Sequence, residues 1–210
     1  MMYRETALYV ALIRINFVLS GVGVFLALYL LVFPFWPQVT YWIDQKTETN
    51  GGITYKGQAA RAAGLSIEEM AKLQDKPTDN RLVIPKIGID APIAIDSKKG
   101  EAFEKGIWRR PNTSTPDLGG NTVLVAHRFL YTSGSHTFYH LDKLSKDDRF
   151  TVYWEGKEYT YVVTDRFEVS PDQIEIENTS PDPIITLYTC TPIFTADKRL
   201  VVRARLDSVL

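Results

Sequence analysis

The chain has 210 residues, of which 45% are hydrophobic and 23% are charged, and its formal net charge is −1. This length accommodates one medium-sized domain with additional segments. The near-neutral charge and the lack of a stripe rich in lysine and arginine argue against a nucleic-acid-binding protein. The sequence has a single cysteine, which excludes an intramolecular disulfide, so cysteine content does not indicate the redox compartment.

The N-terminal segment is predicted to span a membrane. Residues 15–33 carry no charge, and their number is close to the roughly 20 residues that a bilayer-spanning helix needs. Arg4 and Arg14 precede the span, which predicts a cytoplasmic N-terminus and an extracellular location for the rest of the chain. The alternative is a cleaved signal peptide, but neither a short apolar core nor an A-x-A-like cleavage site is evident. Residues 1–36 are therefore expected to form a cytoplasmic N-terminus and a transmembrane signal anchor.

Residues 37–80 are predicted to form an extracellular stalk. Residues 44–52 are polar and contain paired glycines. Ser66-Ile67-Glu68-Glu69 fits a capping box that opens a short helix ending near Gln74. This segment is either a lid over the active site or a spacer.

The remaining residues, 81–210, are predicted to form a mainly β domain. Runs of β-branched and aromatic residues alternate with turn-prone stretches, and Glu155-Gly156 is a hairpin turn signal. Many short strands with little helix predict a closed or nearly closed β-barrel. The expected strands are residues 81–89, 91–95, 121–126, 149–154, 157–169, 184–189 and 199–206.

The last two expected strands place the cysteine beside an arginine. Side chains alternate between the two faces of a strand, and the simplest hairpin register buries the apolar set of both strands together. This register leaves Cys190 and Arg199 on the same, less buried face, at adjoining strand ends. A neighbouring guanidinium favours the thiolate form of cysteine, which is the nucleophile. The alternative is a buried structural cysteine, the usual fate of a lone one.

A cysteine nucleophile needs a histidine that is close in space. His127 ends a core-like strand, which is a rigid mounting for a catalytic group, so it is the preferred candidate. His136 and His140 lie in a loop and are interpreted as ordinary loop histidines, because a zinc site needs further ligands and none is obvious. Asp165 is a candidate to orient His127, although a solvated strand residue is the preferred interpretation.

These segments together resemble the signature of the sortases, which are membrane-anchored cysteine transpeptidases of mainly Gram-positive bacteria. The order and spacing of the histidine, the Thr-Leu-x-Thr-Cys sequence and the arginine are specific. The resemblance covers roughly residues 80–207. It is carried by Val125-Ala126-His127-Arg128, Thr186-Leu187-Tyr188-Thr189-Cys190 and Arg199, and extends to Trp108-Arg109-Arg110-Pro111, Phe138 to Leu144, and Ser180-Pro181-Asp182-Pro183.

The resemblance implies a barrel of about eight strands with its active site in a groove on the outer wall. It implies that Cys190 forms a thioester acyl-enzyme, that His127 is the general acid and base, and that Arg199 stabilises the substrate backbone or the oxyanion. Thr189 and Thr191 are the expected substrate-binding residues. The alternation of the strand turns Thr189 toward the interior, which argues against a substrate contact of this residue. The family needs no metal and no organic cofactor.

The resemblance also implies the partners. These are an LPxTG-like sorting signal of secreted surface proteins and an amine acceptor of the cell envelope, such as a peptidoglycan precursor. Pilin-polymerising sortases carry a lid with an Asp-Pro-aromatic anchor, and no such anchor precedes the domain here, so a spacer is preferred for the stalk. The Thr-Cys-Thr-Pro sequence resembles classes D and E more than A or B.

Two other functions remain open at this level. A cysteine hydrolase on the same scaffold would use the same residues, with water accepting the acyl group. A non-enzymatic, membrane-tethered binding domain would need none of them.

Overall fold

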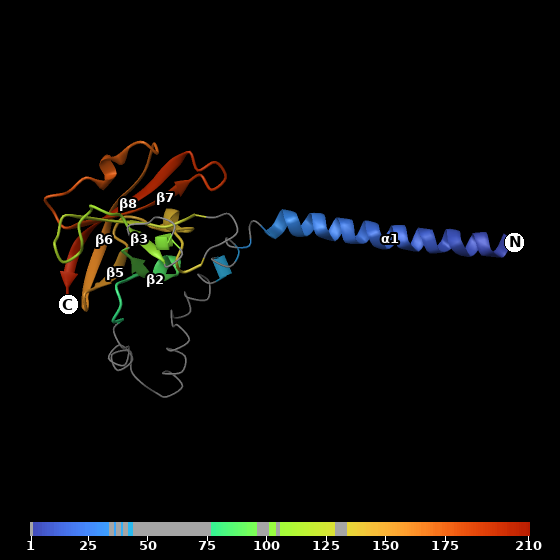
Figure 1. Ribbon diagram of the computed structural model, residues 1–210, viewed down its shortest axis with the longest axis horizontal. Helices are drawn as coiled ribbons and strands as arrows, with labels where there is room; N and C mark the ends of the chain where they lie inside the picture. The colour runs from blue at the N-terminus through green and yellow to red at the C-terminus, as the bar shows by residue number, and fades with distance from the viewer. Residues whose placement is uncertain are drawn as a thin grey trace, which may run out of the picture. The chain divides into compact units, whose positions relative to one another are not determined.

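The computed structural model describes residues 2–33, 36, 39, 42–43, 77–95, 101–103, 106–128 and 134–210, without the side chains of residues 2–12. The chain divides into two compact units, Met1–Asp44 and Gln45–Leu210. The first contains a long helix, and the second contains the described strands (Figure 1).

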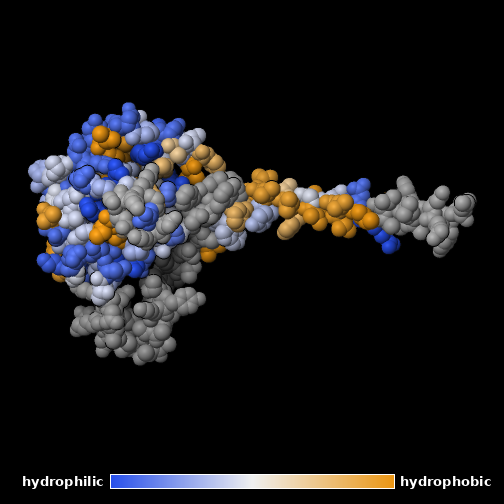
Figure 2. All heavy atoms as spheres, viewed as in Figure 1, coloured by the Kyte–Doolittle hydropathy of each residue, from blue (hydrophilic) through white to orange (hydrophobic). Residues whose placement is uncertain are grey.

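Helix α1 runs from Met2 to Val32, and its segment Ile13–Val32 is long and apolar enough to cross a membrane. None of this segment is buried within the protein, and Figure 2 shows hydrophobic residues along it. The segment contains no proline, so the backbone hydrogen bonds of the helix continue unbroken. The helix fits the predicted transmembrane anchor, while its orientation in a membrane stays a prediction.

In the described part of the second unit, eight strands close into a barrel in the order β1-β2-β3-β4-β7-β8-β6-β5 (Figure 1). Most neighbouring pairs are antiparallel, whereas β2–β3 and β4–β7 are parallel. This confirms the predicted mainly β barrel. The strands are β1 Arg81–Ile84, β2 Ile89–Ala94, β3 Ile107–Arg109, β4 Asn121–Val125, β5 Arg149–Trp154, β6 Lys157–Val169, β7 Ile184–Thr191 and β8 Lys198–Val209.

Short 3₁₀ helices connect some of the strands. They are η2 Pro85–Ile87, η3 Leu141–Lys143 and η4 Ile174–Glu177. The interior of the barrel is filled by one cluster of buried apolar side chains, to which every second residue of a strand contributes. Strand β5 illustrates this alternation, because Phe150, Val152 and Trp154 enter the cluster and the residues between them do not.

Strand β2 begins earlier than expected, strands β7 and β8 extend beyond their expected ends, and two further differences have a clear local cause. Strand β1 ends at Ile84 rather than residue 89, because Pro85 has no N–H to donate and Gly88 turns the chain with a φ of 67°. Strand β3 was not expected, since three residues are too few to show an alternating pattern. The register of the last hairpin is as predicted.

The predicted stalk lies mostly outside the described residues. Residues 44–76, which include the expected short helix, are outside the described residues. The choice between a lid and a spacer therefore stays a prediction, and so do the domain boundaries at residues 36 and 80.

Candidate active site

The candidate site lies on the outer face of β4, β7 and β8, which are neighbours in the barrel. Leu124, Leu187 and Val202 point into the core, so the residues that alternate with them point outward. Three rows of outward residues cross these strands. The first pairs Cys190 with Arg199, the second aligns Trp108, Val125, Tyr188 and Val201, and the third aligns Val123, Thr186 and Arg203.

Cys190 lies near the end of β7, half-buried and with a free thiol. Its partner in the β7–β8 register is Arg199, so the thiol-bearing strand and the arginine-bearing strand are adjacent at this position. The alternation of β7 turns Leu187 and Thr189 inward and leaves Tyr188 and Cys190 on the outer face. The predicted pairing of Cys190 with Arg199 is confirmed as a feature of the fold.

His127 follows strand β4, which neighbours β7 on the side away from β8. The last pair in the parallel β4–β7 register is Val125 with Tyr188. Two residues further along both chains, the same spacing aligns His127 with Cys190. A hydrogen bond of 2.8 Å from Thr189 Oγ1 to the carbonyl of Ala126 shows that the two chains stay together beyond the pairing. The pairing of Cys190 with Arg199 is thus part of the fold, and a continued β4–β7 register would add His127 to the same row, so the joint site of the three residues stays a prediction.

The backbone of His127 is fixed by its surroundings. Its carbonyl accepts a hydrogen bond of 2.9 Å from the N–H of Phe138. Its imidazole lies against the ring of Phe103, with the two ring centroids 4.1 Å apart. Phe103 has no sequence motif that marks it as part of a site, and sequence analysis missed it.

Arg199 is held by its own loop. Its Nη1 donates to the carbonyls of Ala196 at 3.1 Å and Lys198 at 3.0 Å. A guanidinium has five N–H donors in a fixed fork, so these two bonds do not exhaust its capacity. Arg199 can therefore keep its position and still donate to a bound substrate.

The two threonines expected to bind substrate have other partners in the structure. Thr189 is 1% exposed, faces the interior and donates to Ala126, as above. Thr191 is buried, and its hydroxyl accepts a hydrogen bond of 3.2 Å from Nη1 of Arg128. Contacts of either residue with a substrate stay a prediction, and the burial of Thr189 does not favour one.

Arg128 connects the histidine segment to the cysteine strand, and sequence analysis did not assign it a role. Its side chain is 7% exposed. Nε donates to the carbonyl of Tyr139 at 3.0 Å, and Nη2 lies 3.0 Å from Asp142 Oδ1. Together with the bond to Thr191, these contacts tie the residue after His127 to the residue after Cys190.

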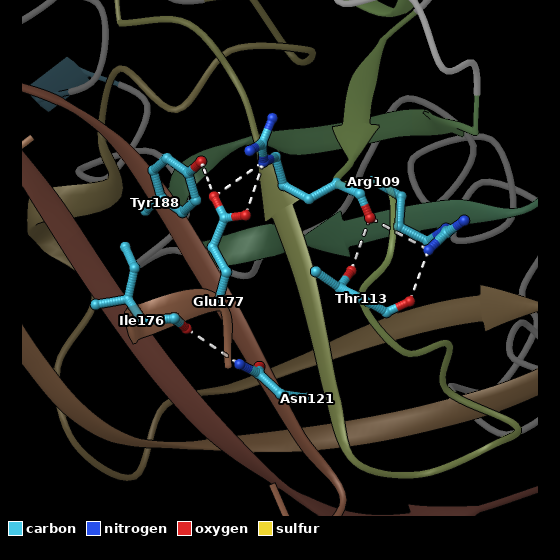
Figure 3. Close-up of polar contacts among 7 residues, drawn as sticks. Arg109, Thr113, Asn121, Ile176, Glu177 and Tyr188 are labelled. Carbon is cyan, nitrogen blue, oxygen red and sulfur yellow. Dashed lines mark hydrogen bonds and ion pairs between the residues drawn. The ribbon is translucent and has the colours of Figure 1, made fainter. Parts of the chain in front are cut away.

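The connection between β6 and β7 contacts the second row of the outer face, at Tyr188. Figure 3 shows how Glu177, at the end of η4, reaches Tyr188, whose hydroxyl donates to Oε1 at 2.6 Å. Both carboxylate oxygens also accept from Nε of Arg110, at 2.9 and 3.0 Å. Burial, together with the hydrogen bond to Glu177, raises the pKa of Tyr188 well above its ordinary value.

Asn121 on β4 also binds the connection between β6 and β7. Its Nδ2 donates to the carbonyls of Ile176 and Asn178, and its Oδ1 accepts from the hydroxyl of Thr186. Figure 3 shows Asn121 beneath Ile176 in this contact. These bonds hold the β6–β7 connection against β4 and β7.

Of the other sequence candidates, Asp165 lies apart from this site. Asp165 is exposed on β6, which is separated from β4 by β7 and β8, so it does not orient His127. His136 is exposed and His140 is 5% exposed against Tyr139. Among the residues that the structure describes, no group of three or more His, Cys, Asp or Glu side chains is arranged to hold a metal ion.

Comparison with known proteins identifies relatives of the barrel. The family model of the sortase domain matches residues 82–207. The sortase A of Bacillus anthracis is 28% identical over 136 residues, which are 65% of this chain and 63% of that protein. The chain matches less than two thirds of the length of its curated relatives.

Solved structures agree with the family match. Sortase C-1 from Actinomyces oris superposes with a TM-score of 0.57 and 28% identity, covering 69% of this chain and 81% of the other. Sortase E1 from Streptomyces coelicolor, solved with a tripeptide in its active site, gives a TM-score of 0.56 and 25% identity. That superposition covers 63% of this chain and 89% of the other.

Proposed function

The chain belongs to the sortase family, and from this premise we propose that it is a cysteine transpeptidase whose reaction is carried by Cys190, His127 and Arg199. The observation that supports the proposal most strongly is the register of three adjacent strands. Cys190 pairs with Arg199 on one side, and continuation of the β4–β7 register aligns it with His127 on the other. This register supports a site in which a nucleophile, a proton carrier and a cation act from one row on the outer wall of the barrel.

The first half of the reaction forms an acyl-enzyme. The thiolate of Cys190 attacks the carbonyl carbon of a peptide bond, which forms a C–S bond and a tetrahedral oxyanion. The C–N bond then breaks, and His127, as the imidazolium, gives its proton to the departing amine. The product is a thioester on Cys190 and a neutral imidazole on His127.

The second half transfers the acyl group. The neutral imidazole of His127 accepts a proton from the incoming amine, whose nitrogen attacks the thioester carbonyl. A new amide bond forms, the C–S bond breaks, and the thiolate of Cys190 and the imidazolium of His127 are regenerated. These two half-reactions consume no oxidant and use no metal.

Arg199 contributes directed hydrogen bonds. An arginine guanidinium is a planar, charged fork of donors, and in Arg199 the Nη1 end of this fork is held by the carbonyls of Ala196 and Lys198. Donors placed where negative charge develops stabilise the transition state in a preorganised way. We assign Arg199 to the oxyanion or the substrate backbone, with a backbone N–H near Thr191 as a second donor.

The substrate class follows from the family. We propose an LPxTG-like sorting signal of secreted surface proteins as acyl donor and an amine of the cell envelope as acceptor. The tripeptide in the active site of the Streptomyces coelicolor relative supports a peptide ligand. The hydrolase alternative differs only in the acceptor.

The location follows from the N-terminal helix. We propose that residues 1–36 anchor the protein with the N-terminus inside, so that residues 37–80 lead to a catalytic domain outside the membrane. Protease added to cells stripped of their wall should digest the domain. Full protection of the domain from protease before lysis would show that the domain lies inside the membrane instead.

The experiment that tests the function uses the full chain, a library of sorting peptides and a free amine, with products read by mass spectrometry. A transpeptidase gives the amine-linked product, whereas a hydrolase gives the carboxylate with or without amine. Labelling of Cys190 by a thiol-reactive peptide mimic, absent in Cys190→Ala, separates an enzyme from a binding domain.

A further inference from the structure

The ring of Phe103 lies against the imidazole of His127. The two centroids are 4.1 Å apart, and the ring planes are inclined by 37°. Phe103 belongs to residues 101–103, which are helical and lie between β2 and β3. Aromatic pairs favour centroid distances of 4.5–7 Å, so this contact is close.

Phe103 is itself held by a small apolar cluster that is separate from the core of the barrel. The cluster consists of Ala94, Ala102 and Trp108, all buried, with Phe103 packed against it. The ring of Phe103 meets that of Trp108 edge to face, with centroids 5.5 Å apart. The phenyl ring therefore contacts both this cluster and the imidazole of His127.

The cluster stands on the same outer face as the site. Trp108 on β3 pairs with Val125 on β4, which precedes His127 by two residues and so shares its face. The guanidinium carbon of Arg110 lies 4.7 Å from the centre of the Trp108 ring. Glu177 fixes Arg110 by two hydrogen bonds and also accepts from Tyr188 on the cysteine strand. A continuous set of contacts thus runs from Tyr188 to Phe103.

We propose that Phe103 is a positioning residue that sets the orientation of the His127 imidazole relative to Cys190. Rotation of a histidine ring about its last side-chain bond has broad energy wells, so the ring needs external support to hold one orientation. Proton transfer in both half-reactions requires a nitrogen of His127 within hydrogen-bond reach of the reacting groups. The tilted phenyl ring in contact with the imidazole supplies this support.

This inference rests on the proposed role of His127, so its test has one readout that is independent of turnover. The full chain is labelled with ¹³C-histidine, and the ring signals of its three histidines are recorded by NMR. Phe103→Leu removes the ring current above His127 and is expected to move the signal assigned by His127→Gln. The signal of the exposed His136 stays in place and serves as the internal reference.

Phe103→Tyr retains the ring and should leave the His127 signal close to its position in the unchanged protein. Phe167→Leu is the matched control for the replacement itself. Phe167 lies on β6, separated from β7 by β8, and its described contact is with Arg203. The Phe167→Leu variant is expected to leave the His127 signal unchanged.

The second readout is turnover of an LPxTG-containing peptide with triglycine as the amine. Phe103→Leu should lower kcat by roughly two- to tenfold, the range of an aromatic pair, with KM changed less than twofold. Phe103→Tyr should restore kcat. Adding Phe103→Leu to His127→Gln should cause no further loss, because Phe103 acts through His127.

The outcomes separate the two proposals. An unmoved His127 signal in Phe103→Leu overturns the inference, and so does an unchanged kcat in that variant. A kcat that falls equally in Phe103→Leu and Phe167→Leu also overturns it. If the unchanged protein turns over no sorting peptide but the His127 signal moves as expected, the proposed function fails while the contact between Phe103 and His127 stands.

Discussion

Replacing Thr189 by valine tests whether the end of β7 fixes the segment that carries His127. Thr189 Oγ1 donates to the carbonyl of Ala126 at 2.8 Å, and both residues are buried, with exposures of 1% and 3%. Valine keeps the shape of the side chain but removes the donor. The loss of one buried hydrogen bond that leaves an acceptor behind costs about 1–3 kcal/mol. For a chain of this length, we expect Tm to fall by about 3 °C per kcal/mol.

The assay is urea unfolding of the Thr189→Val protein, with Thr189→Ser as the matched control that keeps the hydroxyl. The valine variant should lose about 1–3 kcal/mol of unfolding free energy, and the serine variant should lose much less. Because Ala126 directly precedes His127, turnover of the valine variant should fall more than its affinity for peptide. A valine variant as stable as the unchanged protein would refute the reasoning, as would a serine variant that is equally destabilised.

Three further predictions concern the polar groups around the site. Arg199→Lys keeps the charge but loses the fork, so kcat should fall by about 10²–10³-fold, nearly as far as in Arg199→Ala; near-normal turnover of the lysine variant would show that only charge matters. Glu177→Gln removes the carboxylate that accepts from Arg110 and Tyr188, and a double-mutant cycle with Tyr188→Phe should give a coupling energy of about 0.5–3 kcal/mol; additive unfolding free energies would show that the contact contributes nothing. Burial raises the pKa values of Tyr161 and Tyr188, so the folded state keeps their protons where the unfolded chain loses them; the associated stability is complete below about pH 10 and decreases above it. A tyrosinate absorbance titration followed with circular dichroism should show that part of the ionisation coincides with unfolding, and full ionisation of a folded protein near pH 10 would contradict this.

The features that the sequence predicts well are those set by local alternation. The outward parity of Cys190 and Arg199 follows from the apolar residues between them, and the two strands form one hairpin, so the register is determined by the buried face alone. The apolar stretch of α1 is equally local, because length and composition decide it. The inward orientation of the Thr189 side chain also follows from the alternation of side chains along the strand.

The features that the sequence does not predict depend on contacts between distant parts of the chain. Glu177 meets Arg110 across 67 positions, and neither residue belongs to a motif that indicates the pairing. Phe103 contacts His127 only because β3 lies beside β4, and β3 is too short to be recognised from alternation. Arg128 follows the histidine in the sequence, but its link to Thr191 exists only because β4 and β7 run parallel.

A sortase acyl-enzyme is a sorting peptide held as a thioester on Cys190. This species is sought by intact-protein mass spectrometry of the full chain, incubated with a library of such peptides without amine. We predict a mass increase equal to the N-terminal part of the cleaved peptide, located on Cys190 and removed on adding triglycine. The adduct should be absent in Cys190→Ala and form much more slowly in His127→Ala. Product formation by Cys190→Ala would contradict the account, and so would a lack of any adduct or product in a folded protein whose Cys190 reacts with a thiol probe.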